Sequence, residues 1–286
     1  MANLKELRSR INSVSSTMQI TSAMKMVSAA KLSKAQDAIT SMRPYAEKLT
    51  QLLQDLSATL EEESGSEFAE KREVKKVLLV AISSNKGLAG AFNSNIVKKV
   101  KAKIQGEYQG KEVEILSLGK KANDILKKTF PIAGNNNDIF DNLNYDPVAE
   151  IAEDLMQQFL DGKYDKIEII YNQFKNAATQ VVMDEQFLPI EKFESDENKQ
   201  LDYIFEPSKL EIVKELIPKS LKMQLFKALR DSFAAEHGAR MTAMHKATDN
   251  AKELRDDLKL SYNKARQASI TNEILEIVGG AEALNG

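Results

Sequence analysis

An apolar heptad pattern runs through the first sixty residues and constrains the fold more than any other feature of the chain. Alternate steps of three and four residues from Leu4 to Leu60 give seventeen positions, of which fourteen are apolar. The first glycine is Gly65. This spacing is typical of a coiled-coil helix. At about 1.5 Å per residue the helix would be roughly 80 Å long, more than one compact domain covers, so we expect it to project.

The seam of this predicted helix changes character about twenty residues from its start. Its first five positions are apolar: Leu4, Leu7, Ile11, Val14 and Met18. The next three are polar: Thr21, Lys25 and Ser28. An apolar stripe lies on a neighbouring face, at Ile20, Met24 and Val27. Two interpretations are open, namely a local change in supercoil phase or a segment that faces a different partner.

The C-terminal part of the chain repeats the heptad pattern. From Met244 to Leu275, eight of ten positions are apolar, and they include Leu254 and Leu258. Continued backwards, the line passes through Arg240, so polar groups interrupt this seam as well. We interpret His237, on the same line, as a register-setting or solvent-edge residue and not as a metal ligand.

Sequence punctuation predicts where this second helix begins and ends. Ser208 is a plausible N-cap with Glu211 three residues on. Pro218 is expected to break or bend the first stretch, and the pair Gly279-Gly280 to end the last one. Two long helices at opposite ends of one chain can cover each other's seams by pairing antiparallel.

The middle of the chain is predicted to be an α/β domain. Apolar strand-like runs occur at 77–82, 113–118 and 166–171, with one or two more strands within 179–190, and they alternate with predicted helices around 96–100, after Gly119 and at 148–160. Such alternation implies a largely parallel, doubly wound, Rossmann-like sheet. Polar loops are expected at 135–137 and 191–200. We therefore divide the chain into an N-terminal helix (1–60), an α/β domain (61–207) and a C-terminal helix (208–286).

Composition argues against several kinds of chemistry. The chain has no cysteine and only two histidines, which excludes disulfides and cysteine metal sites and leaves no zinc-binding H-E-x-x-H motif. We expect no metal, no cofactor and no catalytic residue. No apolar run approaches the roughly 18 residues of a membrane span, and the N-terminus lacks a signal-peptide core.

Charge is distributed unevenly along the chain. The count of Lys and Arg minus Asp and Glu is 8 − 4 in residues 1–60, 19 − 27 in 61–207 and 13 − 11 in 208–286. Two mildly basic ends therefore flank an acidic middle. The lysine cluster at 98–103 lacks interleaved aromatic residues and lies in this acidic domain, so we expect a solvated helix face and no nucleic-acid partner.

The turn at 83–90 follows a predicted strand, where a phosphate-binding loop would lie. A Walker loop needs G-x-x-x-x-G-K-[S/T], but here the two glycines are three apart and Lys86 precedes both. Only a G-x-x-G fragment of the dinucleotide fingerprint is present. We interpret the turn as structural and expect no direct nucleotide binding. The alternative function from sequence is a nucleotide-binding enzyme with a coiled-coil oligomerisation arm.

Four segments of the chain carry recognisable motifs, at residues 20–31, 43–45, 236–251 and 258–281. These segments resemble the gamma-subunit family of F-type ATP synthases. The turn from Ser84 to Gly90 also matches, with departures at Asn85, Lys86 and Ala89. The terminal motifs are long and specific, and the resemblance spans nearly the whole chain.

This resemblance implies a shaft of two antiparallel terminal helices that turns inside a ring of alpha and beta subunits. The α/β domain would lie beside the epsilon subunit and the membrane c-ring, and proton or sodium flow would drive rotation. The family's gamma subunit contributes no catalytic residue. Without a transit peptide or regulatory cysteines, the chain is expected to be a peripheral protein on the cytoplasmic side of a bacterial plasma membrane.

The resemblance also assigns interface residues. Those matching the contacts with the surrounding stator ring are Met24, Lys25, Arg266, Gln267, Thr271 and Glu273. Those matching the end near the rotor ring and epsilon are Tyr203, Phe205 and Glu206. These roles are what the family motifs imply, and each stays an expectation at this stage.

Overall fold

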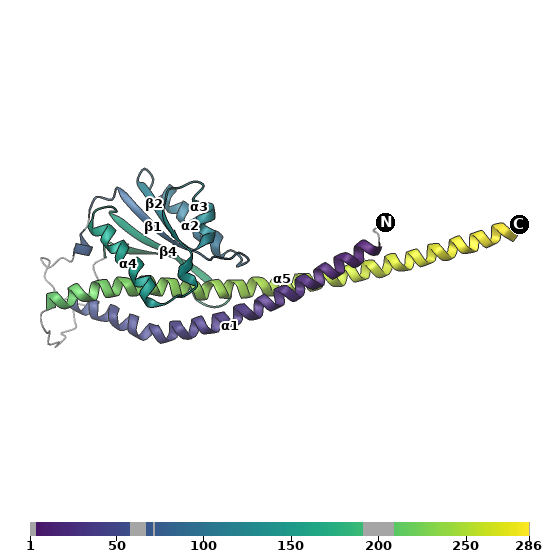
Figure 1. The fold of residues 1–286 in the computed structure, drawn as a ribbon, viewed down its shortest axis with the longest axis horizontal. Helices are drawn as coiled ribbons and strands as arrows, with labels where there is room; N and C mark the ends of the chain where they lie inside the picture. Colours follow the sequence, from purple (N-terminus) through teal and green to yellow (C-terminus); the bar gives the residue numbers. More distant parts are fainter. Residues whose placement is uncertain (1–3, 58–66, 71, 191–208, 286) are drawn as a thin grey trace. The chain divides into compact units, whose positions relative to one another are not determined.

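The computed structural model describes residues 4–57, 67–70, 72–190 and 209–285 (Figure 1). Its main elements are α1 (Leu4–Ser57), β1 (Lys76–Ile82), α2 (Phe92–Gln105), β2 (Glu112–Leu118), α3 (Lys120–Leu126), β3 (Ile132–Asn136), α4 (Tyr145–Leu160), β4 (Lys166–Phe174), β5 (Gln180–Leu188) and α5 (Lys209–Asn285). Short 3₁₀ turns lie at Glu67–Ala69 and Asp138–Phe140. Two compact units form: one contains Ala29–Arg240, and the other contains the two helical ends, up to Ser28 and from Met241.

The sheet has the strand order β3-β2-β1-β4-β5, in which all neighbours are parallel except β4 and β5. The prediction of a largely parallel, Rossmann-like sheet is therefore confirmed. Its central strand β1 is apolar from Val77 to Ile82, and each of those residues is buried. Both faces of β1 are covered, which explains why its sequence is a continuous apolar run and not an alternating one.

Alternate residues of β1 face two separate cores. On one face Val77, Leu79 and Ala81 pack against α2 and α3. On the other face, Leu78, Val80 and Ile82 belong to a core that includes α4 and the adjoining parts of α1 and α5. Figure 1 shows α2 and α3 on the side of the sheet away from α5. Helices on both faces make the fold doubly wound, and the long terminal helices supply part of one layer.

The polar loop predicted at 135–137 is wrong for its first two residues, because β3 extends to Asn136. Asn135 and Asn136 pair with Ser117 and Leu118 of β2. β3 is an edge strand of the sheet, so its main chain forms hydrogen bonds with β2 while its side chains remain partly exposed to solvent. A polar composition therefore does not exclude a strand at this place.

The break predicted at Pro218 and the helix end predicted at Gly279-Gly280 are both wrong, while the alternative of a bend at Pro218 stays a prediction. Pro218 lies inside the helix, where the carbonyl that loses its donor belongs to the exposed Lys214, so water can satisfy it. Gly279 and Gly280 lie inside α5 as well. Neither has the positive φ that ends a helix at glycine, so the helical hydrogen bonding continues past them.

The helical ends pair antiparallel, as predicted. Thr248 donates to Thr21 over 2.8 Å, and Arg255 donates to the Met18 sulfur over 3.6 Å. The predicted seam residues lie along this contact: Leu7 and Met244 are buried, and Leu4, Ile11, Val14, Met18 and Leu258 are half-buried.

The seam does not change phase at its polar stretch. Thr21 and Ser28 are both buried, whereas Ile20 is 60% exposed and Val27 58% exposed. The interpretation of a local phase change is therefore wrong. Ile20 and Val27 of the apolar stripe face outward and Met24 is half-buried, which agrees with the second interpretation.

Leu254, predicted in the seam, is 51% exposed, so this assignment is wrong. Arg255 is half-buried in its place, with Ala251 and Leu258 one turn to either side. The stem of an arginine is apolar enough to cover a helix seam while its charged end reaches the edge. Alternate steps of three and four residues are compatible with either Leu254 or Arg255 in the seam. The prediction chose Leu254 because it is the more apolar of the two.

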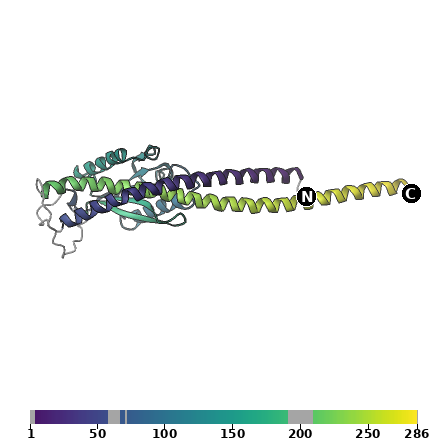
Figure 2. The same ribbon diagram turned by 90° about the horizontal axis from the view of Figure 1, so that it is seen from below.

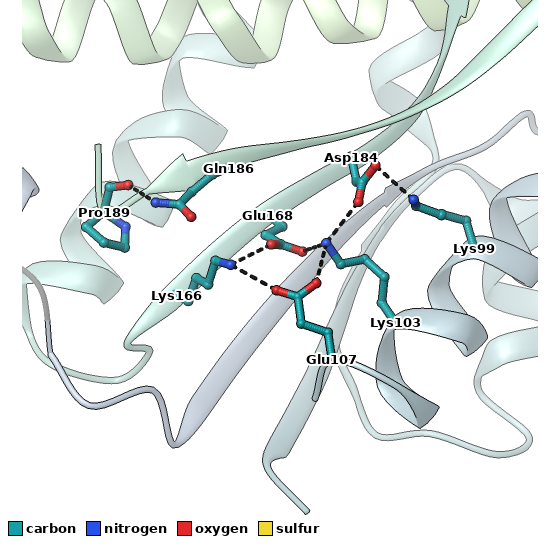
Figure 3. A network of polar contacts seen from close by, with 8 residues as sticks. All are labelled: Lys99, Lys103, Glu107, Lys166, Glu168, Asp184, Gln186 and Pro189. Atoms are coloured by element: carbon teal, nitrogen blue, oxygen red, sulfur yellow. Dashed lines mark hydrogen bonds and ion pairs between the residues drawn. The ribbon is translucent and has the colours of Figure 1, made fainter. Parts of the chain in front are cut away.

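A buried ion network joins α2 to β4 and β5 (Figure 3). The Lys103 ammonium, 9% exposed, lies 2.6 Å from Glu168, 3.0 Å from Asp184 and 3.1 Å from Glu107. Lys166 bridges Glu168 and Glu107 from the other side. Burial would lower the pKa of Lys103, but the hydrogen bonds to the carboxylates outweigh it and raise that pKa. Each charge in the network is paired, so it acts as a structural joint and not as an acid–base pair.

Replacing this central cation tests the joint. Lys103→Met leaves Glu168 buried without its closest partner, and we expect a loss of about 3–5 kcal/mol in unfolding free energy, measured by urea titration at neutral pH. Lys99→Met is the matched control, because Lys99 pairs with Asp184 at a partly exposed site, and it should cost about 1 kcal/mol or less. Equal losses in the two variants would contradict the assignment.

The same network predicts a dependence of stability on pH. Burial opposes ionisation of Glu107, but its hydrogen bond with Lys103 prevails and lowers the pKa of Glu107 from 4.5 to about 2. A carboxylate with a depressed pKa stabilises the fold fully above its unfolded pKa, and this contribution disappears as the pH falls through the folded value. The urea midpoint should therefore fall between pH 4.5 and 2, and the fall should be smaller in Lys103→Met.

Candidate functional site

The place where a doubly wound sheet binds ligands is filled in this protein. Ligands of such folds bind outside the carboxyl ends of the strands where the strand order reverses, which here is beside β1 and β4. Ala235 and Ala239 of α5 are buried at this place against Ala89 and Phe92. A Cβ on Gly238 would lie 3.2 Å from the Ala177 main chain, so α5 packs closely on the β4–β5 hairpin.

The turn between β1 and α2 presents carbonyl groups to protein donors. Arg240 of α5 donates to the carbonyls of Lys86 and Gly87, over 3.0 and 3.3 Å. The Ser84 hydroxyl donates to the same Lys86 carbonyl over 2.6 Å, and Asn93 accepts from the Ser84 amide. A phosphate cradle instead points successive N–H groups at its ligand. This geometry supports the structural interpretation of the turn.

The two histidines lie in different environments. His237 is buried, so the prediction of a solvent-edge position is wrong for it; its ring meets Phe233 edge-on, with the centroids 4.4 Å apart. Burial, with the nearby charges of Arg240 and Lys31, lowers the pKa of His237 to about 4, so it is neutral at physiological pH. His245 is exposed and lies 3.5 Å from Asp249. The two rings therefore form no catalytic pair.

The described residues contain no group of three or more His, Asp or Glu side chains arranged to hold a metal ion. Within those same ranges, no helix combines the length and the apolar character required to cross a bilayer. What remains as a candidate functional surface is the outside of the terminal helices.

The interface residues assigned from sequence fall into three groups in the structure. Arg266, Gln267, Thr271 and Glu273 are all exposed on α5. Met24 and Lys25 are half-buried, and the Lys25 ammonium lies 3.5 Å from the His245 ring. The third group lies outside the described residues: Tyr203, Phe205 and Glu206.

Arg240, assigned to the shaft seam, is buried as a seam residue would be, but its guanidinium bonds to the β1–α2 turn. The heptad pattern predicted that Arg240 lies on a buried face of the helix, but it did not predict that its partner is the β1–α2 turn. The signal that sequence reasoning missed is the pair Glu236 and Arg240, four residues apart on one helix, beside an alanine- and glycine-rich patch.

The structure also reveals an apolar surface that the sequence prediction did not list. Beyond the start of α1, the last turns of α5 run on without a neighbouring helix among the described residues (Figure 2). All described residues from Ile270 to Ala281 are exposed. The large apolar residues among them are Ile270, Ile274, Leu275, Ile277 and Val278. A contiguous exposed set of this kind marks an interaction site.

Comparison with known proteins places these features in a family. The family model described as ATP synthase matches residues 3–284. The ATP synthase gamma chain of Christiangramia forsetii is 79% identical over 286 residues, and that of Flavobacterium johnsoniae 70% identical over 287 residues, each alignment covering all of both chains.

Solved structures agree with this assignment. A chain in the central stalk and c-ring of the Tetrahymena thermophila mitochondrial ATP synthase has a TM-score of 0.61 and 28% identity, covering 80% of this chain and 99% of its own. A chain of the Euglena gracilis mitochondrial ATP synthase rotor shares the fold, with a TM-score of 0.66 at 21% identity, over 93% of this chain and 98% of its own. From its sequence and its fold together, the chain belongs to the ATP synthase gamma chain family.

Proposed function

We propose that this chain is the central rotor shaft of an F-type ATP synthase. It turns inside the ring of alpha and beta subunits and couples proton or sodium flow through the membrane c-ring to ATP synthesis or hydrolysis at the beta-subunit sites. The observation that carries the proposal is 79% identity to an ATP synthase gamma chain over the whole length of both proteins. The chain is a non-catalytic subunit, and its partners are the alpha, beta and epsilon subunits and the c-ring.

The stator interface of the shaft lies on the outer faces of its terminal helices. Exposure of Arg266, Gln267, Thr271 and Glu273 supports this assignment, because each side chain is available to a surrounding subunit. On the N-terminal helix the exposed apolar residues Ile20, Met26 and Val27 extend the surface beyond Met24 and Lys25. Methionine offers an adaptable contact, which suits a shaft that meets three different beta conformations in turn.

The basic bias of the N-terminal helix supports the same role. Residues 1–36 contain six Lys or Arg and a single acidic residue, Glu6. Long-range electrostatic attraction to acidic stator loops keeps the rotor close to the surrounding subunits. It does so without tight short-range contacts, which would stop rotation.

The remaining assignments follow the family motifs. Tyr203, Phe205 and Glu206 contact the rotor ring or epsilon. The division drawn from sequence punctuation stays a prediction: shaft helices at 1–60 and 208–286 around the domain 61–207, although the inner parts of both helices pack within the compact unit Ala29–Arg240. The family resemblance implies a peripheral protein on the cytoplasmic side of a bacterial plasma membrane. These statements rest on the matching segments quoted above.

Reconstitution tests the stator interface. We expect the chain to co-purify with several larger alpha and beta subunits per copy. Arg266→Glu reverses a charge at a predicted contact and should lower coupled ATP synthesis by about tenfold or more, as for a truncated hot spot. Lys264→Glu is the matched control, because Lys264 is also exposed, two residues away on the same helix. A similar loss in both variants would argue for a general charge effect instead of a specific contact.

A calorimetric titration separates this function from that of a nucleotide-using enzyme. α5 fills the crevice beside β1 and β4, and Arg240 donates hydrogen bonds to the carbonyls of the adjacent turn. Titration of ATP or NAD into the isolated chain should therefore give no saturable heat of binding. Stoichiometric binding of either nucleotide would contradict the shaft proposal and favour the enzyme.

A further inference from the structure

A buried charged side chain of α5 bonds to the main chain of the α/β fold. Arg240 is 7% exposed, and its guanidinium donates to the carbonyls of Lys86 and Gly87. Glu236, one helical turn earlier and 8% exposed, accepts from the other end of the same guanidinium over 2.5 Å. We call these two side chains and the two carbonyls the clip. It connects parts of the chain that are about 150 residues apart in sequence.

The surroundings of the clip are apolar, with small residues on α5 that face Ala89, Phe92 and Phe174. Ala235, Gly238 and Ala239 form the contact face of α5, and Gly238 packs on Ala177 and Phe174. Apolar burial is non-directional, so this small-residue contact does not by itself fix where the guanidinium lies relative to the turn. Hydrogen bonds from a planar guanidinium to fixed carbonyls are directional. The clip therefore adds a directional constraint at this end of the contact, beyond the core packing of Leu225 and Leu229.

The turn that receives the clip is held in an unusual conformation. Leu88 has a φ of 63°, a value that few residues other than glycine adopt, and it is 66% exposed. A non-glycine residue keeps such a conformation only where its neighbours determine it. The bonds from Arg240 and Ser84 to the Lys86 carbonyl, two residues earlier, are among the constraints, together with the bond that the Asn85 side-chain amide donates to the Asn137 carbonyl. The turn is thus a stiff receptor for the guanidinium.

Among the described residues, Gln224 and Lys222 of α5 also make polar contacts with the same unit, and these differ from the clip. Gln224 donates to the Gln186 carbonyl over 3.1 Å, and Lys222 pairs with Glu153 of α4. The Lys222 and Glu153 pair is partly in solvent, where an ion pair contributes little. Gln224 is uncharged. The clip differs from these two contacts because it joins a buried cation to main-chain acceptors.

We propose that Arg240, oriented by Glu236, is a positioning residue that locks α5 to the β1–α2 turn so that turning force passes between helix and domain without slip. This proposal rests on the shaft function above. Arg240 touches no substrate; it acts by keeping two elements of one rigid unit in register. The expected consequence of losing it is a looser joint in a protein that still folds.

Spin-label distance measurements on the isolated full chain test the lock. The chain contains no cysteine, so two labels can be placed without background, at the exposed Lys98 of α2 and the exposed Lys219 of α5. The test variant is Arg240→Met with Glu236→Gln, which removes the clip without leaving a buried charge unpaired. We expect a broader distance distribution with unchanged helical circular dichroism. An unchanged distribution would overturn the lock.

Two further variants separate the lock from a general effect of arginine. Arg255→Met is the matched control, because Arg255 lies on the same helix and contacts Met18 and Asp256 instead of the α/β fold, so the distribution should stay narrow. Arg240→Lys keeps the charge but lacks the planar fork that spans carboxylate and carbonyls, so its distribution should be of intermediate width. If the Arg240→Lys variant gave a distance distribution as narrow as that of the parent chain, the requirement for a guanidinium would be contradicted.

The mechanical consequence is tested in the assembled complex in vesicles, by ion pumping and ATP hydrolysis on the same sample. The double variant should hydrolyse ATP yet pump fewer ions per ATP, whereas Arg255→Met should keep the ratio of the parent. A broadened joint with an unchanged ratio would overturn the transmission of force. If the parent chain failed to assemble with alpha and beta subunits, the shaft function itself would fail, and the spin-label result would still decide the lock.

Discussion

The fold depends on covering both faces of one buried sheet. α2 and α3 cover the first face, and α4 alone is too small to cover the second. Leu49 of α1 and Leu225 and Leu229 of α5 complete that core. Segments from the two ends of the chain are therefore structural parts of the α/β unit, because apolar strand residues must be removed from water on both sides. A change in this part of a terminal helix is also a change in the domain core.

The same packing fills the place where a Rossmann-like fold usually binds its ligand. The crevice at the reversal of strand order is the usual ligand site of such sheets, and here the alanines of α5 occupy it. The carboxylates buried among α2, β4 and β5 are neutralised by Lys103 and Lys166. What a gamma chain of ATP synthase needs from its fold is stiffness and an outer surface, and both observations serve stiffness.

Predictions from the sequence were correct where burial requires apolar residues. They failed where the same pattern of residues was compatible with two different arrangements. The β1 run predicted a strand covered on both sides, and the seam from Leu4 to Met18 predicted helix pairing. Polar Thr21 and Ser28 lie within the seam because their small hydroxyl groups donate locally, Ser28 to the Met24 carbonyl and Thr21 to the Met18 carbonyl. An apolar Leu254 lies outside it because Arg255 covers the contact with its stem.

The sequence by itself determined the class of fold, the long terminal helices, the absence of cysteine chemistry and, through its terminal motifs, the family. These properties depend on local periodicity and composition, which a single chain displays without its partners in space. Only the tertiary structure decided that α5 fills the ligand crevice, that Asn135 and Asn136 belong to an edge strand, and that Arg240 bonds to the Lys86 carbonyl. Those outcomes depend on which distant segments meet, and no local pattern specifies the partner of a buried side chain.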